Sequence, residues 1–492
     1  MPAARIFVEQ RWGARQRVFG GLSYGQSKGK ILRISEVVSG LTGGWIGSEV
    51  TVRLGVTGLS RAGKTVFITS LVANLLDRGR MPQFLGAASG AVQAAYLQPQ
   101  PDDTVPRFEY ETHLAALTAD QPHWPQSTRN VSQLRVSLKV QPTGLLGNLS
   151  GPRVVHLDIV DYPGEWLLDL GLLDKSYAEW SAGVLEMIRG RDCAAEFLAQ
   201  DVDATAPFDE TQAQELAAVY TTYLHAAREA GFSDCTPGRF LLPGEMEGSP
   251  VLTFAPVPQP DSPKRGSIWR EMERRYEAYK KQVVQPFFRD HFAKIDRQVV
   301  LLDALGAIHR GPQAVEDMRR ALGDVLRAFR PGKVGFLASL FGVHRVERIL
   351  FAATKADHLH HRQHPRLTAI ITAMLRDARD RADFSGALTS AMSIAALRAT
   401  VEETIEHDGK RLDCVRGTLL DSGKQAAFYP GELPDDPAKL LSPAREGAQN
   451  WLGEDYRIMS FAPAPLHLKP GEGPPHIRLD KAAEFLIGDY LR

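Results

Sequence analysis

The segment Gly58-Leu-Ser-Arg-Ala-Gly-Lys-Thr65 decides how the rest of this sequence is interpreted. It matches the pattern G-x-x-x-x-G-K-[ST], in which a glycine-rich loop lets backbone N–H groups surround phosphate oxygens. The apolar, β-branched run Val50–Val56 precedes it and predicts a buried strand, and an apolar helical stretch from Val66 to Leu76 follows it. A strand, this loop and a helix in that order predict a phosphate-binding loop, because the helix N-terminus adds a favourable dipole.

The residues of this loop have separate predicted roles. We expect the nucleotide phosphates to be bound by Ser60, Arg61, Ala62, Gly63, Lys64, Thr65 and Val66. Lys64 would contact the β- and γ-phosphates in binding and catalysis, and the Thr65 hydroxyl would be a ligand of Mg²⁺. The Arg61 guanidinium could supply the positive charge that a monovalent cation or a partner's arginine would otherwise bring. The alternative is an arginine that faces solvent or pairs with an acid.

A second motif follows the apolar run Val154–Val160, where Asp161-Tyr-Pro-Gly164 matches D-x-x-G. A carboxylate at the end of a strand can hold Mg²⁺, and the Gly164 N–H could contact a γ-phosphate. The next residue, Glu165, stands where many GTPases have a water-orienting glutamine. A carboxylate there would repel the γ-phosphate, so we expect slow turnover or a water molecule positioned from elsewhere.

A third motif, Thr354-Lys-Ala-Asp357, follows the apolar strand expected at Arg348–Ala353 and resembles the [NT]-K-x-D guanine motif. The Asp357 carboxylate could accept hydrogen bonds from guanine N1–H and the exocyclic amine, whereas adenine presents the opposite pattern. The stem of Lys355 could lie along the ring, and Thr354 takes the usual place of asparagine. Near the expected strand Ala391–Leu397, Ala395 or Ala396 could present a backbone N–H to the guanine carbonyl.

With these motifs the chain resembles the YcjX-like family of bacterial P-loop GTPases. The resemblance rests on residues 58–65, on 161–166 (D-Y-P-G-E-W), on 352–358 (A-A-T-K-A-D-H) and on 393–400 (S-I-A-A-L-R-A-T). It covers roughly residues 48–492. It implies an α/β fold, namely a Ras-like P-loop NTPase G domain with a helical insertion. It also implies a stress-related bacterial role and a partner that could be a membrane protein.

Switch I, the loop that would close over Mg²⁺ and the γ-phosphate, should supply a threonine between the first helix and a hairpin expected at Leu134–Val140 and Val154–Val160. Thr128, in Trp124-Pro-Gln-Ser-Thr-Arg-Asn130, is the first choice, and Thr112 is the alternative. Arg129 beside Thr128 could face the phosphates or solvent. The predicted Mg²⁺ ligands are therefore Thr65, Thr128 and Asp161, with GTP or GDP as the nucleotide.

Changes in sequence character divide the chain into five parts. We expect an N-terminal extension (1–47), a first half of the G domain (48–165), a helical insertion (166–296), a second half (297–400) and a C-terminal extension (401–492). Within them we expect a hairpin of Leu134–Val140 and Val154–Val160, an irregular segment 81–130, and a short strand Tyr456–Phe461. Pro286 should kink or end the clearest helix of the insertion, the amphipathic stretch Ile268–Phe287.

Composition excludes several classes of protein. With 58 basic and 58 acidic side chains, the chain lacks the basic excess of proteins that coat nucleic acid. No apolar run reaches the length of a membrane-spanning helix, and three distant cysteines form no disulfide framework. The arginine-rich first 30 residues lack an apolar signal core. They are expected to be a disordered extension or the result of a start codon placed too far upstream, with a transit peptide as the alternative.

These observations predict a cytoplasmic GTPase, with a peripheral location at the inner membrane as an alternative. Two other functions stay open: a GTP-gated scaffold with little hydrolysis, and an ATPase or nucleotide kinase. The Thr354–Asp357 motif argues against the ATPase. A histidine cluster, His358, His360, His361 and His364, follows the guanine motif, but no cysteine or paired carboxylate nearby in the sequence completes a metal site.

Overall fold

The computed structural model describes residues 49–58, 62–126, 130–141, 151–328, 346–376, 387–446 and 457–491. Four residues of interest, Ser60, Arg61, Thr128 and Arg129, lie outside the described residues, as does the predicted extension 1–47. The alternative switch residue, Thr112, lies on an exposed face of a short helix.

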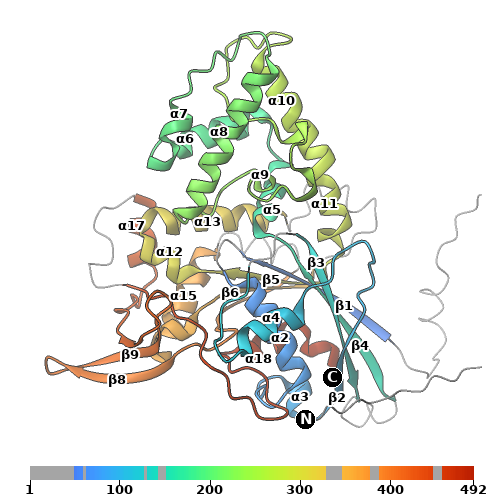
Figure 1. Cartoon of the computed structure of the whole chain (residues 1–492), viewed down its shortest axis with the longest axis vertical. Coiled ribbons are helices and arrows are strands. Elements are labelled where there is room, and N and C mark those ends of the chain that lie inside the picture. The colour runs from blue at the N-terminus through green and yellow to red at the C-terminus, as the bar shows by residue number, and fades with distance from the viewer. Residues whose placement is uncertain are drawn as a thin grey trace, which may run out of the picture. The chain divides into compact units, whose positions relative to one another are not determined.

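A seven-stranded sheet forms the centre of the described chain (Figure 1). Its order is β2-β3-β4-β1-β5-β6-β7. Strands β1, β4, β5, β6 and β7 are parallel, and β3 pairs antiparallel with both β2 and β4. The strands are β1 Glu49–Gly58, β2 Val92–Gln98, β3 Ser132–Val140, β4 Arg153–Asp161, β5 Arg297–Leu302, β6 Arg348–Ala353 and β7 Leu388–Ser393. The predicted hairpin is confirmed as β3 and β4.

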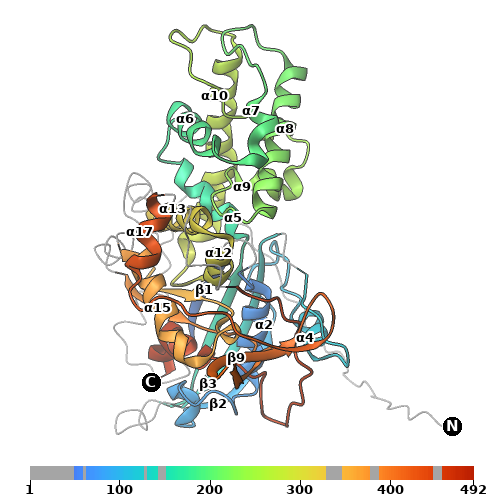
Figure 2. The same cartoon turned by 90° about the vertical axis from the view of Figure 1, so that its left-hand side faces the viewer.

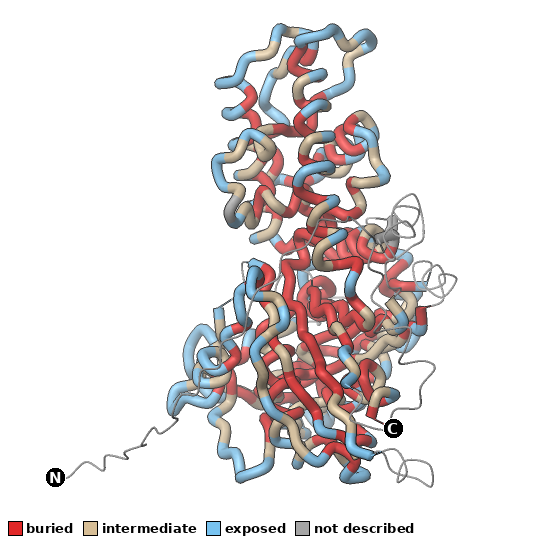
Figure 3. Tube along the Cα trace, turned by 90° about the vertical axis from the view of Figure 1, so that its right-hand side faces the viewer, coloured by how far each residue is buried: buried red, intermediate tan, exposed pale blue. Residues whose placement is uncertain are grey.

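Alternate residues of the central strands enter two separate cores, because successive side chains of a strand point to opposite faces. In β5, Val299 and Leu301 pack in one core, and Val300 and Leu302 pack in the other. Helices α2 (Lys64–Leu76) and α18 (Leu479–Ile487) cover the first face. Helices α12 (Ala304–Arg310), α13 (Pro312–Ala328) and α15 (His364–Met374) cover the second face. The buried strands lie between these layers (Figure 3).

The parallel strands bring their carboxyl ends to one edge of the sheet. Gly58, Asp161, Leu302 and Ala353 each end a strand there. In open α/β sheets ligands bind at this edge, beyond the carboxyl ends of the strands. The three motifs of the sequence therefore meet at one place although they are nearly 300 residues apart at the extremes.

Helices between β4 and β5 form the insertion, which extends from the carboxyl side of the sheet (Figure 2). They are α5 Gly164–Leu168, α6 Tyr177–Ile188, α7 Ala195–Leu198, α8 Glu210–Glu229, α9 Gly238–Leu241, α10 Ile268–Tyr279 and α11 Gln285–Asp290. A cluster of buried aromatic rings, including Trp180, Tyr220, Phe254 and Tyr276, packs them together. A π-turn at Lys280–Val284 joins α10 to α11, so the helix continues past Pro286. The predicted end of the helix at that proline is wrong, because Pro286 occupies the first turn of α11. The other possibility, a kink at Pro286, stays a prediction.

Two sequence expectations need correction. The segment 81–130 is not irregular, since it contains α3 (Leu85–Ala88), strand β2 and α4 (Tyr110–Thr118). Strand β2 reads Val-Gln-Ala-Ala-Tyr-Leu-Gln and has little β-branched character, so its pairing with β3 determines its conformation. Residues 457–461 form no strand, and Phe461 makes only a single bridge to Leu419.

The C-terminal extension contains a small antiparallel sheet and a helix, α17 (Ala438–Glu446). Strands β8 (Val401–His407) and β9 (Lys410–Thr418) form a hairpin, and β10 (Gln425–Phe428) pairs with β9. Its turn is Asp408-Gly409, with φ of 50° and 70°. An Asp-Gly pair in such a turn is a strong hairpin signal, and the sequence interpretation missed it.

Among the described residues, no helix is both long enough and apolar enough to cross a bilayer.

Candidate functional site

A cavity of about 410 Å³ opens at the carboxyl edge of the sheet. Its volume lies within the usual range of sites for small ligands and cofactors. Residues of the phosphate loop, the guanine motif, the insertion and the C-terminal extension all line it, including Gly63, Lys64, Thr65, Val66, Trp124, Glu165, Arg228, Thr354, Lys355, Asp357, Ala395, Ala396 and Phe461. The fold thus brings the predicted binding residues from both ends of the chain to one cavity.

Gly63 of the phosphate loop adopts φ of 78° and is the N-cap residue of helix α2. Glycine is suited to this left-handed conformation because it carries no Cβ. Lys64 lies in the first turn, with its Nζ 4.0 Å from Asp161 Oδ1. Ala62 and Thr65 also line the cavity, so the described part of the loop provides a cation and a hydroxyl at the helix N-terminus.

Asp161 is the last residue of β4, and its side chain is only 1% exposed. It pairs in register with Val56 of β1, two residues before the phosphate loop, which explains its proximity to Lys64. Gly164 begins helix α5 and is buried. Asp161 and Gly164 are not among the residues that line the cavity, whereas Glu165 is.

The carboxylate of Glu165 is paired with an arginine of the insertion. Its Oε1 lies 3.1 Å from the guanidinium of Arg228, in the last turn of α8, and both side chains line the cavity. The two side chains are 10% and 29% exposed. Arg228 lies 63 positions after Glu165 in a helix without any local motif, so nothing in the sequence pointed to this ion pair.

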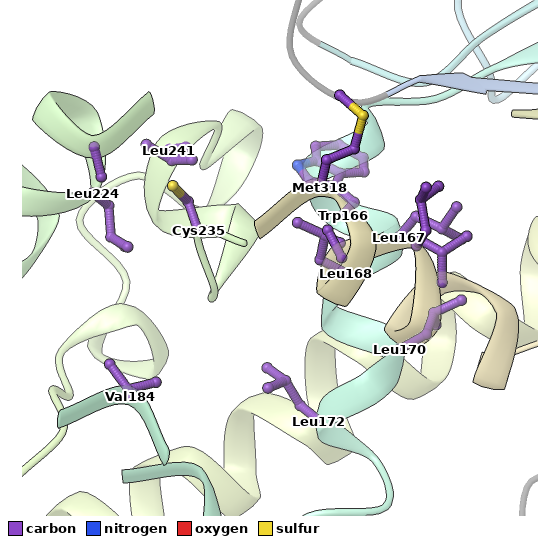
Figure 4. Close-up of a cluster of buried hydrophobic side chains, with 14 of the residues drawn as sticks. Trp166, Leu167, Leu168, Leu170, Leu172, Val184, Leu224, Cys235, Leu241 and Met318 are labelled. Atoms are coloured by element: carbon purple, nitrogen blue, oxygen red, sulfur yellow. The ribbon is translucent and has the colours of Figure 1, made fainter. Parts of the chain in front are cut away.

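The segment after D-x-x-G packs tightly on the insertion. Trp166 Nε1–H donates to the carbonyl of Leu242, and the guanidinium of Arg239 lies 3.2 Å from the centre of the Trp166 indole. A Cβ on Gly238 would stand 2.1 Å from the carbonyl oxygen of Glu165, so only glycine allows this approach. Figure 4 shows Trp166 and the following leucines among side chains of the insertion and α13.

Asp169 adds a buried polar link between this segment and the insertion. Its carboxylate accepts hydrogen bonds from Gly238 N–H, at 2.8 Å, and from the Tyr279 hydroxyl, at 2.5 Å. Complete burial raises the pKa of Asp169 to about 6, although these hydrogen bonds act in the opposite direction. A shift of the D-x-x-G segment would therefore disturb helices α9 and α10 as well.

The guanine motif is held by main-chain and side-chain contacts at the ends of β5 and β6. The Thr354 hydroxyl donates to Leu302 O at 3.2 Å, and Lys355 Nζ lies 2.6 Å from Asp303 Oδ2. Lys355 adopts φ of 60°. Asp357 Oδ2 accepts from Ala399 N–H at 2.8 Å, which fixes the carboxylate at the cavity wall. The Thr354 side chain therefore makes a hydrogen bond to the end of β5, in the place where the motif usually has an asparagine side chain.

The structure distinguishes the two alanines proposed for the guanine carbonyl. The Ala395 N–H donates to the carbonyl of Ile477 at 3.0 Å. Ala396 follows it and also lines the cavity. Of the two, Ala396 is the better candidate, because a donor already bound to Ile477 must give up that bond to reach a base.

Several aromatic residues of this cavity were missed from the sequence. Trp124 Nε1–H donates to the carbonyl of Phe461 at 2.8 Å, and both residues line the wall. His358 meets Phe461 edge to face, with ring centres 5.1 Å apart. Burial lowers the pKa of His358, so a neutral imidazole faces the cavity at neutral pH. Phe461 reaches the cavity because it packs with Ala399 and Val415 and forms a bridge to Leu419.

The sheet order, the phosphate loop and the guanine motif together define a Ras-like P-loop GTPase fold with a helical insertion. A model of the YcjX-like family, DUF463, matches residues 52–491, and the chain belongs to that family. It is similar to a protein of Escherichia coli (strain K12) called Ras-like GTPase YcjX, with 38% identity over 466 residues, which cover 91% of this chain and 97% of that protein. A relative of the same name from Shewanella oneidensis (strain MR-1) is 35% identical over 468 residues, covering 89% and 94%.

Proposed function

We propose that this protein binds GTP in the cavity, hydrolyses it to GDP and phosphate with Mg²⁺, and acts as a nucleotide-dependent conformational switch. One observation carries the proposal. A single cavity is lined at once by Lys64 and Thr65 of a phosphate loop and by Asp357 of a guanine motif. The names of the two relatives support the same nucleotide.

At the phosphate end, the chain supplies charge and hydrogen-bond donors. The helix N-terminus and Lys64 stabilise negative charge on the β- and γ-phosphates, and this charge grows on the leaving oxygen during hydrolysis. A hydroxyl at Thr65 and a carboxylate at Asp161 are the hard oxygen ligands that Mg²⁺ prefers. Thr65 lies in the first turn of α2, and Asp161 ends β4 with its carboxylate 4.0 Å from Lys64 Nζ. When bound, Mg²⁺ would neutralise phosphate charge. Ser60 and Arg61 are predicted to bind the phosphates, and Thr128 is predicted to be a ligand of Mg²⁺.

At the base end, Asp357 selects guanine. Its carboxylate accepts from Ala399 N–H on one oxygen, and that bond orients the group toward the cavity. A guanine base offers two adjacent donors, N1–H and the exocyclic amine, to such an acceptor. The stem of Lys355, fixed by Asp303, can cover one face of the ring.

The switch would work through Glu165 and Trp166. Both follow Gly164, which would sense the γ-phosphate, and both contact the insertion through Arg228 and Leu242. Loss of the γ-phosphate would allow this segment to move, and the helices of the insertion that contact it would then move as well. The insertion is therefore the part that we expect to report the nucleotide state to a partner.

A GTP-gated scaffold with little hydrolysis is the second candidate. The presence of Glu165 in place of a water-orienting glutamine favours it. The ion pair with Arg228 weakens that argument, because the paired carboxylate repels a phosphate less than an isolated one. Measured turnover decides between the two candidates.

The first prediction concerns phosphate release from the purified full chain with GTP and ATP in parallel. We expect release from GTP and not from ATP, because adenine presents the wrong hydrogen-bond pattern to Asp357. Tight GTP binding without release would identify the scaffold, or a GTPase that needs an activating partner. Equal use of ATP would show that the Thr354–Asp357 motif does not select guanine.

The second prediction concerns the ion pair of Glu165 and Arg228. Arg228→Ala should weaken binding of a non-hydrolysable GTP analogue more than binding of GDP, because it leaves an uncompensated carboxylate near the γ-phosphate. For unit charges roughly 7 Å apart at an effective dielectric constant of about 20, the repulsion is ~2 kcal/mol, or about thirtyfold in affinity. Competition binding with both nucleotides measures the ratio.

Two further variants make this test specific. Adding Glu165→Gln to Arg228→Ala should restore most of the affinity for the analogue, since the repulsive charge is then gone. Arg189→Ala removes an exposed arginine from the same insertion and should leave both affinities unchanged. An equal loss of GDP and analogue binding in Arg228→Ala would contradict the electrostatic explanation.

We further propose a stress-related role, as the family resemblance implies, and a protein partner, which could be a membrane protein, that binds the helical insertion. The proposed location is cytoplasmic, with a peripheral position at the inner membrane as the alternative. We expect no nucleic acid partner, given the balance of 58 basic and 58 acidic residues.

A further inference from the structure

The histidine cluster after the guanine motif separates into two kinds of residue in the structure. His358 packs against Phe461, and His364 Nε2 lies 2.8 Å from Ala356 O while its Nδ1 lies 3.0 Å from Arg478. These two imidazoles are used in packing and hydrogen bonding. His360 and His361 instead face the β8–β9 hairpin, with ring centres 4.3 Å apart.

The hairpin supplies the carboxylates that the local sequence lacks. Glu402 of β8 pairs in register with Val415 of β9, so Asp413, two residues earlier, lies diagonally on the same face. Glu402 Oε2 is 2.6 Å from His361 Nδ1 and 3.8 Å from His360 Nε2. Asp413 Oδ2 is 3.9 Å from His360 Nδ1. Residues about 40 to 50 positions apart therefore converge on one point.

We propose that His360, His361 and Glu402 bind a divalent transition metal, with Zn²⁺ as the first candidate. One ligand atom from each residue lies within 4.8 Å of the other two. Tetrahedral Zn²⁺ with bonds of about 2.0–2.2 Å places its ligand atoms about 3.4 Å apart. The His360–Glu402 separation is already close to this value, and the His361–Glu402 pair must open by less than about 1 Å. Two imidazoles favour Zn²⁺ over Mg²⁺ or Ca²⁺.

The exposure of the two histidines suits such a site. His360 is 8% exposed and provides a fixed ligand, whereas His361 is 61% exposed and can move onto an ion that arrives from solvent. Asp413 stands behind His360 Nδ1 as the outer carboxylate that commonly orients a metal-bound histidine. In that state His360 Nδ1 carries the proton and Nε2 binds the ion. The Arg362 N–H, 3.5 Å from Nδ1, must then give up a weak contact.

Local charge sets the expected affinity. Arg398 lies 3.9 Å from Glu402 Oε1, and Arg362 lies 3.0 Å from Asp413 Oδ2. These two arginines already offset the two carboxylates, so a divalent ion enters a neutral rather than an anionic site. Three protein ligands in such a site should bind Zn²⁺ more weakly than the four ligands of a closed structural zinc site. Without metal, the same residues form histidine–carboxylate pairs.

A bound ion would fasten the β8–β9 hairpin to the segment that carries the guanine motif. His360 lies three residues after Asp357, and Arg398 adjoins Ala399, whose N–H holds the Asp357 carboxylate. The metal site does not depend on the nucleotide function, because none of its three ligands lines the cavity.

The test is metal binding by the full chain after treatment with a chelator and its removal. Titration with ZnCl₂ followed by calorimetry should show one ion per chain, and Co²⁺ should give the intense visible absorption of a tetrahedral site. His361→Ala and Glu402→Gln should weaken Zn²⁺ binding at least tenfold. Neither change removes a packed core side chain, so both variants should fold. His360→Ala is the third variant, and it should weaken Zn²⁺ binding as well.

His407→Ala provides the matched control, since it removes an exposed histidine of the same hairpin that lies 3.6 Å from Asp408. Its Zn²⁺ affinity should equal that of the unmodified chain. No uptake at ~100 µM Zn²⁺ would overturn the proposal. So would full affinity in His361→Ala and Glu402→Gln, or an equal loss in His407→Ala.

Discussion

Replacing Lys64 with methionine is expected to lower the rate of GTP hydrolysis by about 10²–10³-fold, the usual cost of removing one preorganised charge or donor from a transition state. Methionine keeps the unbranched stem and removes the charge. The Lys64 side chain is 14% exposed and its Nζ lies 4.0 Å from Asp161, so the charge acts in a partly desolvated site. Single-turnover phosphate release with saturating GTP measures the effect directly.

Two controls separate chemistry from folding. Lys139→Met makes the same substitution at an exposed position of β3 and should leave turnover unchanged. Thermal unfolding of Lys64→Met reports whether the loss of a cation beside the buried Asp161 destabilises the fold. Turnover of Lys64→Met within a factor of a few of the unmodified chain would mean that the loop does not hold the reacting phosphate.

Replacing Asp357 with asparagine is expected to weaken GTP binding by roughly 10²–10⁴-fold, because two charge-assisted hydrogen bonds are lost. The asparagine oxygen can still accept from Ala399 N–H, so the local structure should survive. The new amide offers a donor where the carboxylate offered an acceptor. Xanthine has a carbonyl where guanine has its amine, so XTP binding should rise as GTP binding falls.

Competition between GTP, XTP and ATP measures this change in specificity. Asp408→Asn is a suitable control, since Asp408 lies in the hairpin turn with φ of 50°, a conformation that asparagine tolerates well. Equal loss of all nucleotides together with a lower melting temperature would indicate a folding defect. Unchanged GTP affinity would contradict the assignment of Asp357 to the base.

The sequence predicted well those elements whose signal is local. The strand before the phosphate loop, the helix after it and strand β6 before Thr354 are all present. Each combines an apolar run with a loop whose chemistry requires particular residues at fixed spacing. Strand β2 was missed because its Ala and Gln residues carry no strand pattern, and its pairing with β3 supplies the stabilisation.

The residues that complete the cavity could not be predicted in this way. Arg228 reaches Glu165 only because α8 ends beside the D-x-x-G segment, and Phe461 reaches Trp124 only because the last part of the chain folds back. Neither residue belongs to a motif, and no periodicity marks it. The separation in sequence is 63 residues in the first case and 337 in the second.

The histidine cluster also combines a feature visible in the sequence with contacts that only the tertiary structure reveals. The sequence placed four histidines within seven residues, but it gave no reason to choose among them. The structure uses His358 and His364 in packing, and it brings Glu402 to His360 and His361 across the hairpin.

The sequence by itself determined the chemistry of the motifs, because backbone geometry and phosphate or base recognition act over a few residues. Only the tertiary structure decided which distant charges face them, because strand register and helix packing set those distances.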